Sequence, residues 1–240
     1  MADKKEVAKK EGSAVAKVSQ PGRGFEEHTS KEDLIIPRAE LVQPQSPAAL
    51  EDPATFHLGM IINSITRDVL PAEFIPVFKF TRWIRFNPRN KEDANFDPAF
   101  DLGAEMWRSD DPEDPRVLEQ GVFGPNGEKP LATKSLNFLA FFPGSMMPVI
   151  VRFNNTSFKA GKKLLSLALY SGGDMFSRKY KLTSSIVKND KGTFAVLEVA
   201  PAGMADEDSF KIAESWWNQF KAKVKDIEVH DPEKDAGQDG

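Results

Sequence analysis

Residues 78–86 read Phe-Lys-Phe-Thr-Arg-Trp-Ile-Arg-Phe, and this alternation of apolar and polar side chains predicts a β-strand. Successive side chains of a strand point to opposite faces of its sheet, so the nine residues divide into two sets. The even-numbered set is a core face with one misplaced cation (Phe78, Phe80, Arg82, Ile84 and Phe86), and the odd-numbered set places cations beside an aromatic ring (Lys79, Thr81, Trp83 and Arg85).

The odd-numbered face has two interpretations. A flat ring and positive charges exposed to water suit a single-stranded nucleic acid, because bases stack on the ring while phosphates meet the cations. In the alternative, the strand lies between two layers and Trp83 is covered. The alternation alone does not choose between them.

Composition indicates a globular protein with polar loops: 40% of the residues are hydrophobic, and the chain contains 17 prolines and 16 glycines. The absence of cysteine excludes disulfides and thiolate zinc sites. No secretory signal is recognisable at the start, and the longest apolar runs, Phe138–Phe142 and Met146–Val151, are strand-sized. We therefore expect a cytoplasmic protein with no membrane partner.

Four regions differ in composition. Residues 1–30 lack periodicity and are predicted to be disordered. Residues 31–225 are predicted to form one globular domain, interrupted at about 87–134 by a long insertion rich in Asp, Pro and Gly. Residues 226–240 hold six acids against one lysine and are predicted to be an acidic, disordered tail.

The predicted elements are mostly strands. They are an extended segment at 34–42, strands at 57–66, 74–86 and 147–153, a helix after 154–157 that runs to 169, a hairpin of 176–187 with 193–200, and a final helix from about 206. This order predicts a β-rich α+β fold, either an OB-like barrel or an antiparallel sheet, with one internal and one C-terminal helix. Closure of a barrel does not follow from the sequence.

The net charge of −4 conceals a segregation of sign. Residues 76–91 carry five bases and no acid, residues 92–119 carry ten acids, and residues 129–191 carry eleven bases against two acids. A chain with basic strands and acidic appendages is able to bind a polyanion locally despite its overall charge.

Signals of catalysis are weak. The three histidines, His28, His57 and His230, do not show metal-ligand spacing, and no nucleophile or phosphate-loop motif is present. We predict a non-catalytic protein with no metal and no cofactor. The alternative within the enzyme class is a metal-dependent nuclease or recombination enzyme, in which Asp110 and Asp111 of the insertion hold the ion.

Several short motifs resemble a known class of protein. They are Ile36-Pro37-Arg38, the segment 43–47, Asn63-Ser64-Ile65-Thr66, Tyr180-Lys181-Leu182, Lys191-Gly192-Thr193-Phe194 and the closing aromatic helix. Together they resemble bacteriophage replication-associated single-stranded DNA-binding proteins, many of which are OB-folds with an acidic C-terminal tail. The resemblance implies single-stranded DNA and replication proteins as partners. Because the chain ends Gln238-Asp239-Gly240, it lacks the terminal aromatic residue with which such tails often dock on partners.

The combined prediction is largely sequence-independent binding of single-stranded DNA in replication or recombination, by a monomer or homodimer. Cations would follow the phosphates and aromatic rings would stack on the bases. The predicted binding residues are Lys79, Trp83, Arg85, Trp107, Lys159, Lys162, Lys163, Lys179, Tyr180 and Lys181. The main alternative is a phage structural or assembly protein whose aromatic faces meet copies of itself.

Overall fold

The computed structural model describes residues 35–145, 147–190, 192–221 and 228–229. The predicted disordered segment 1–30 and most of the predicted acidic tail lie outside these residues. The strands are β1 Ile35–Ile36, β2 Ala39–Leu41, β3 Ile61–Asn63, β4 Glu73–Phe86, β5 Glu105–Ser109, β6 Ala132–Phe141, β7 Val149–Asn154, β8 Arg178–Asn189, β9 Gly192–Met204 and β10 Glu228–Val229. The α-helices are α1 Pro47–Glu51, α2 Pro115–Gln120, α3 Phe158–Tyr170 and α4 Glu207–Phe220.

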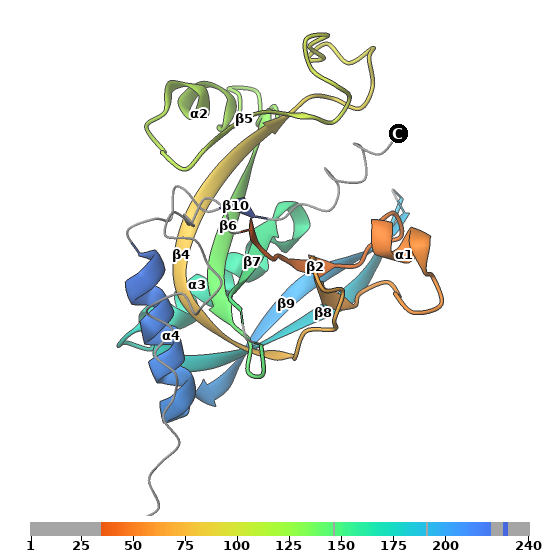
Figure 1. Ribbon diagram of the computed structural model, residues 1–240. Helices are drawn as coiled ribbons and strands as arrows, with labels where there is room; N and C mark the ends of the chain where they lie inside the picture. The colour runs from red at the N-terminus through yellow and green to blue at the C-terminus, as the bar shows by residue number, and fades with distance from the viewer. Residues whose placement is uncertain (1–34, 146, 191, 222–227, 230–240) are drawn as a thin grey trace, which may run out of the picture.

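The strand β4 organises the molecule. The main sheet has the order β7-β6-β4-β8-β9, and β5 pairs with the far end of β4. Glu73 and Phe74 pair with β8, residues 75–85 pair with β6, and residues 83–86 pair with β5, all antiparallel. Figure 1 shows β4 as a long curved strand that connects the β8–β9 hairpin to the part of the molecule containing β5 and α2.

The fold is the predicted β-rich α+β class, in the form of an antiparallel sheet without a closed barrel. The segment 38–43 contacts both edge strands of the main sheet, β7 and β9. On one side Arg38 forms an isolated bridge with Ile150 of β7. On the other, the Gln43 side-chain amide donates to the Ala195 carbonyl at 2.9 Å and accepts from the Ala195 amide at 3.0 Å. At this edge β9 is therefore bonded to a side chain, whereas closure of a barrel would require a strand paired with it.

The two faces of the β7-β6-β4 part of the sheet carry different helices. On the face that we call the α3 face, Phe138 and Phe153 pack with Leu164 of α3 in one core cluster. On the opposite, α4 face, Phe141 contacts Trp216 of α4 edge to face, with ring centroids 5.3 Å apart. Since Lys79 pairs with Phe138 and Arg82 pairs with Ser135, the alternation in β4 sends the odd-numbered side chains to the α3 face.

A register shift between Pro76 and Phe78 breaks the pairing of β4 with β6. Proline has no amide proton for the ladder, so strands tolerate it at edges and bulges. Before the shift, Phe74 belongs to the α3-face core and Ile75 to the α4-face core, and after it Val77 and Phe78 both belong to the α4-face core. The bulge therefore reverses the alternation of β4, because even-numbered side chains point to the α3 face before it and to the α4 face after it.

The insertion contains more structure than the sequence predicts. Its first part is organised around the buried Asn87, whose amide donates to the carbonyls of Asp97, Phe100 and Asp101 at 2.9–3.1 Å. Its second part forms β5 and α2, and β5 adds a strand to β4. Neither β5 nor α2 was predicted, and both are short, five and six residues long.

The insertion also supplies the partner of Arg82, the one cation on the predicted core face. The Arg82 guanidinium donates two hydrogen bonds to the Asp110 carboxylate, each at 2.7 Å. The two side chains are only 4% and 12% exposed. A bidentate pair of this kind satisfies both charges where water is largely excluded.

Both long helices form where predicted. Asp206 caps α4 by accepting from the Ser209 amide at 2.9 Å, and α4 packs on the sheet through the buried Trp216. Its neighbour Trp217 is 36% exposed. In α3, Leu164 and Ala168 are buried in the core, whereas Leu169 is 71% exposed because it points to another side of the helix.

Removal of Asp110 tests the buried pair. We expect Asp110→Ala to lower the free energy of unfolding by about 3 kcal/mol, because it leaves the Arg82 charge buried without its carboxylate. The neighbouring Asp111 is exposed, so Asp111→Ala is the matched control and should change stability by less than about 1 kcal/mol. Urea unfolding followed by tryptophan fluorescence measures both, and equal losses in the two variants would contradict a structural role specific to Asp110.

Candidate nucleic-acid interface

Trp83 is covered, which corrects the expectation that its ring faces water. The side chain is 6% exposed and packs in a small cluster with Val117 of α2 and Ala132. Gly121, at the end of α2, approaches so closely that a Cβ there would lie 3.0 Å from Trp83 Cδ1. The ammonium of Lys134 lies 5.0 Å from the centre of the Trp83 ring. A base cannot stack on this ring in the observed conformation.

Three other predicted contacts are also engaged within the protein. Arg85 is buried and donates to the carbonyls of Leu131 and Asn95, each at 3.2 Å. Trp107 is half-buried, donates from Nε1 to Gln120 at 3.3 Å, and has the Arg116 guanidinium 5.1 Å from its ring centre. Tyr180 is 2% exposed and belongs to the α3-face core. These side chains are part of the structural framework.

The two lysines of β8 lie apart from the others. The Lys179 ammonium forms an ion pair with Glu73 at 3.4 Å. Lys181 is exposed, and its neighbours Tyr180 and Leu182 both belong to the core beneath α3. Because side chains alternate along β8, Lys181 points to the face of the β8–β9 hairpin that is turned away from α3.

Five lysines do lie on the same side of the β7-β6-β4 sheet. Lys79 of β4 and Lys134 of β6 point to the α3 face, as their pairing with Phe138 and Trp83 shows. Partial burial lowers the pKa of Lys79, and the charge of Lys134 lowers this pKa further. Lys159, Lys162 and Lys163 are exposed on α3, which covers that same face. Within the described part of the chain, no carboxylate forms a salt bridge with any of the five.

The same helix carries an aromatic residue that sequence reasoning missed. Tyr170, the last residue of α3, is 86% exposed. Lys159, Lys163 and Tyr170 are spaced by four and seven residues, so they line the same side of the helix. This spacing was readable in the sequence once the helix was known to reach residue 170. We call Lys79, Lys134, Lys159, Lys162, Lys163 and Tyr170 the α3 lysine surface.

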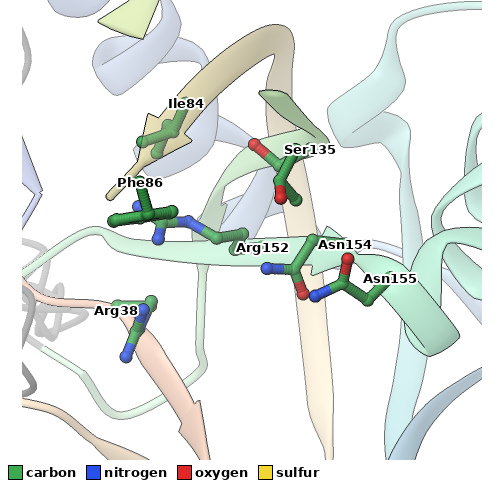
Figure 2. Close-up of a pocket in the computed structure, with 8 residues that line it drawn as sticks. Arg38, Ile84, Phe86, Ser135, Arg152, Asn154 and Asn155 are labelled. Carbon is green, nitrogen blue, oxygen red and sulfur yellow. The ribbon is translucent and has the colours of Figure 1, made fainter. Parts of the chain in front are cut away.

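A polar pocket of about 250 Å³ opens at the other side of the sheet. It is lined by Arg38, Ile84, Phe86, Thr133, Ser135, Arg152, Asn154 and Asn155. Figure 2 shows Arg152 extending along β7 towards Phe86, with Arg38 approaching from the segment between β1 and β2. None of these eight residues was predicted as a binding residue, because they come from four separate segments of the chain.

The acidic residues of the insertion are arranged differently from a metal site. Asp110 is held by Arg82, and Asp110 and Asp111 border a second pocket of about 260 Å³ together with Arg82, Arg108 and Ser109. Among the residues that the structure describes, no group of three or more histidine or acidic side chains is placed to hold a metal ion. None of the described helices is long and apolar enough to cross a membrane.

The pKa of Lys79 gives a direct test of the lysine pair. We expect Lys134→Ala to raise this pKa towards its ordinary value without restoring it, because burial is the larger cause of the shift. With a folded-state pKa below the unfolded one, the unfolded chain binds more protons between the two values, so stability rises with pH in that window. Lys134→Ala should reduce this rise. NMR titration of labelled lysine side chains measures the pKa, and Lys129→Ala is the control. An unchanged Lys79 pKa in Lys134→Ala would contradict the electrostatic interaction between the two lysines.

Comparison with known proteins identifies the family but no function. The family model described as Pam3 phage gp34-like protein matches residues 4–225. No significant match was found among curated proteins or among solved structures. The match confirms the prediction of a bacteriophage protein, whereas binding of single-stranded DNA stays a prediction. The chain belongs to the Pam3 phage gp34-like family.

Proposed function

We propose that the protein binds single-stranded DNA without base specificity, through the α3 lysine surface. The observation that carries the proposal is the placement of Lys79 and Lys134 on the same face of the sheet. Burial lowers the pKa of Lys79, and the like charge of Lys134 lowers this pKa further. Like charges on one face are unfavourable by themselves and become favourable when a polyanion neutralises both ammonium groups.

The lysines of α3 extend this positive surface. Because α3 packs on the face that carries Lys79 and Lys134, all five charges are presented to one side of the sheet. Lysine side chains act as mobile point charges, and a set of them on one side suits a flexible polyanion better than a single anion. Each phosphate that a lysine neutralises releases counterions, which makes the affinity depend on salt.

Tyr170 replaces Trp83 as the proposed stacking residue. Its ring is exposed and lies on the side of α3 that also carries Lys159 and Lys163. Stacking of a base on an aromatic side chain contributes about 1–3 kcal/mol and tolerates any base. Lys159, Lys163 and Tyr170 therefore combine phosphate contacts with a base contact on one helix.

Titration with a fluorescent oligo-dT at several salt concentrations tests the proposal. The double variant Lys159→Ala/Lys163→Ala should bind more weakly and reduce the slope of log affinity against log salt by about 1.4, since each phosphate contact to a single strand contributes ~0.7. Tyr170→Ala should cost about 1–3 kcal/mol of binding free energy, and Tyr170→Phe should cost little.

The matched control removes two lysines elsewhere. Lys188 is at the end of β8, and Lys211 is on α4, which covers the opposite face of the sheet. Lys188→Ala/Lys211→Ala changes the net charge equally and should leave the salt slope unchanged. Equal losses in the two double variants, or no binding by the unaltered protein, would contradict the proposed surface.

The same measurements separate this function from the assembly alternative. Leu118, Val122 and Phe123 in the insertion are 59%, 52% and 69% exposed, and exposed apolar side chains in one segment favour contact with another protein surface. A protein that acts through self-association would form a stable oligomer in light-scattering measurements and would show no salt-dependent binding of oligo-dT.

A further inference from the structure

We propose that the pocket between Arg38 and Arg152 is an oxyanion site, which binds a phosphate or carboxylate group. The pocket opens on the α4 face, where Ile84 and Ser135 point, whereas the α3 lysine surface lies on the opposite face. The proposal therefore goes beyond the proposed function and does not depend on it.

The sheet register brings the polar lining together. Thr133 of β6 pairs with Ile84 of β4, and Ser135 of β6 pairs with Asn154 of β7. Directly paired residues of antiparallel strands point to the same face, so two hydroxyls and an amide converge beside Ile84. Arg152 precedes Asn154 by two residues and therefore shares this face.

The second arginine is held in place by its backbone. The Arg38 amide donates to Ser64 Oγ at 2.9 Å, and the Arg38 carbonyl accepts from the Ser64 amide at 2.9 Å. The adjacent Pro37 carbonyl accepts from the Ile150 amide of β7 at 2.8 Å. These bonds attach the Arg38 segment to the edge of the sheet next to β7, and both arginines border the same pocket (Figure 2).

The donor set fits an oxyanion. A guanidinium presents a planar fork of donors that matches phosphate and carboxylate oxygens, and asparagine amides and hydroxyls add neutral donors. Among the residues that the structure describes, those that line the pocket include no acid. Arg38 and Arg152 are both partly buried, and reduced access of water strengthens an ionic contact.

Two sources offer this chemistry. One is the phosphate group of another molecule, such as a nucleotide or a DNA strand. The other is this chain, since Asp231, Glu233, Asp235 and Asp239 follow β10 in the sequence. β10 runs parallel to β1 with Val229 beside Ile36, and Arg38 comes two residues after Ile36. Both strands therefore run in the direction that leads from Ile36 to Arg38.

The test is a titration of the full chain with sodium phosphate, against sodium chloride at matched ionic strength, followed by calorimetry and by the unfolding temperature. We expect saturable binding of phosphate, weakened about tenfold or more by Arg152→Gln and less by Arg152→Lys, which keeps the charge without the fork. Arg108→Gln is the control, because Arg108 is exposed and lies outside the pocket. If Arg152→Gln does not fold, Arg38→Gln replaces it.

A chain truncated after Val229 distinguishes the two sources. Tighter phosphate binding after truncation assigns the pocket to carboxylates of the chain's own C-terminal segment, which then compete with phosphate. Unchanged phosphate binding assigns it to the phosphate of another molecule. Equal phosphate affinity in Arg152→Gln and the unaltered chain, or no saturable binding in either the full or the truncated chain, would overturn the proposal. Oligo-dT binding through the α3 lysine surface is measured separately. Failure of the oxyanion site is therefore distinguishable from failure of the proposed DNA binding.

Discussion

The constraint on which the structure depends is that one strand, β4, must satisfy three partners along its fourteen residues. Its first residues pair with β8, its centre with β6 and its end with β5. Its two faces contribute to two cores, and the register shift at Pro76–Phe78 reverses the alternation, so that Phe74 belongs to the α3-face core and Phe78 to the α4-face core. The two candidate sites lie on opposite faces of the sheet, the α3 lysine surface on one and the pocket lined by Arg38 and Arg152 on the other.

The Arg82–Asp110 pair governs what the outer part of β4 exposes. Burial of a single guanidinium is costly, and its carboxylate partner comes from the insertion, immediately after β5. The same insertion supplies α2, which covers Trp83 together with Ala132. The ring that suggested base stacking is thus part of the interface between the insertion and the sheet, whereas exposed lysines and the exposed ring of Tyr170 are found on α3.

The two candidate sites differ in the chemistry of their cations. The α3 lysine surface offers ammonium groups on flexible stems over a broad area, which suits a mobile polyanion. The pocket on the α4 face offers two guanidinium groups, fixed by strand positions and accompanied by amides and hydroxyls, which suits a single oxyanion. A sheet with both faces partly open allows the two sites to be built on the same strands.

Local sequence determined the features that depend on neighbouring residues: the alternation of residues 78–86, the β8–β9 hairpin, the Asp206 cap of α4 and the lysines of α3. Only the tertiary structure decided which faces are covered. Alternation shows that Trp83 and Arg82 point opposite ways, but it holds no information about a segment 25 to 40 residues away that packs on them. The Arg38 and Arg152 pocket was equally unreadable, because strand register and not sequence proximity brings its residues together.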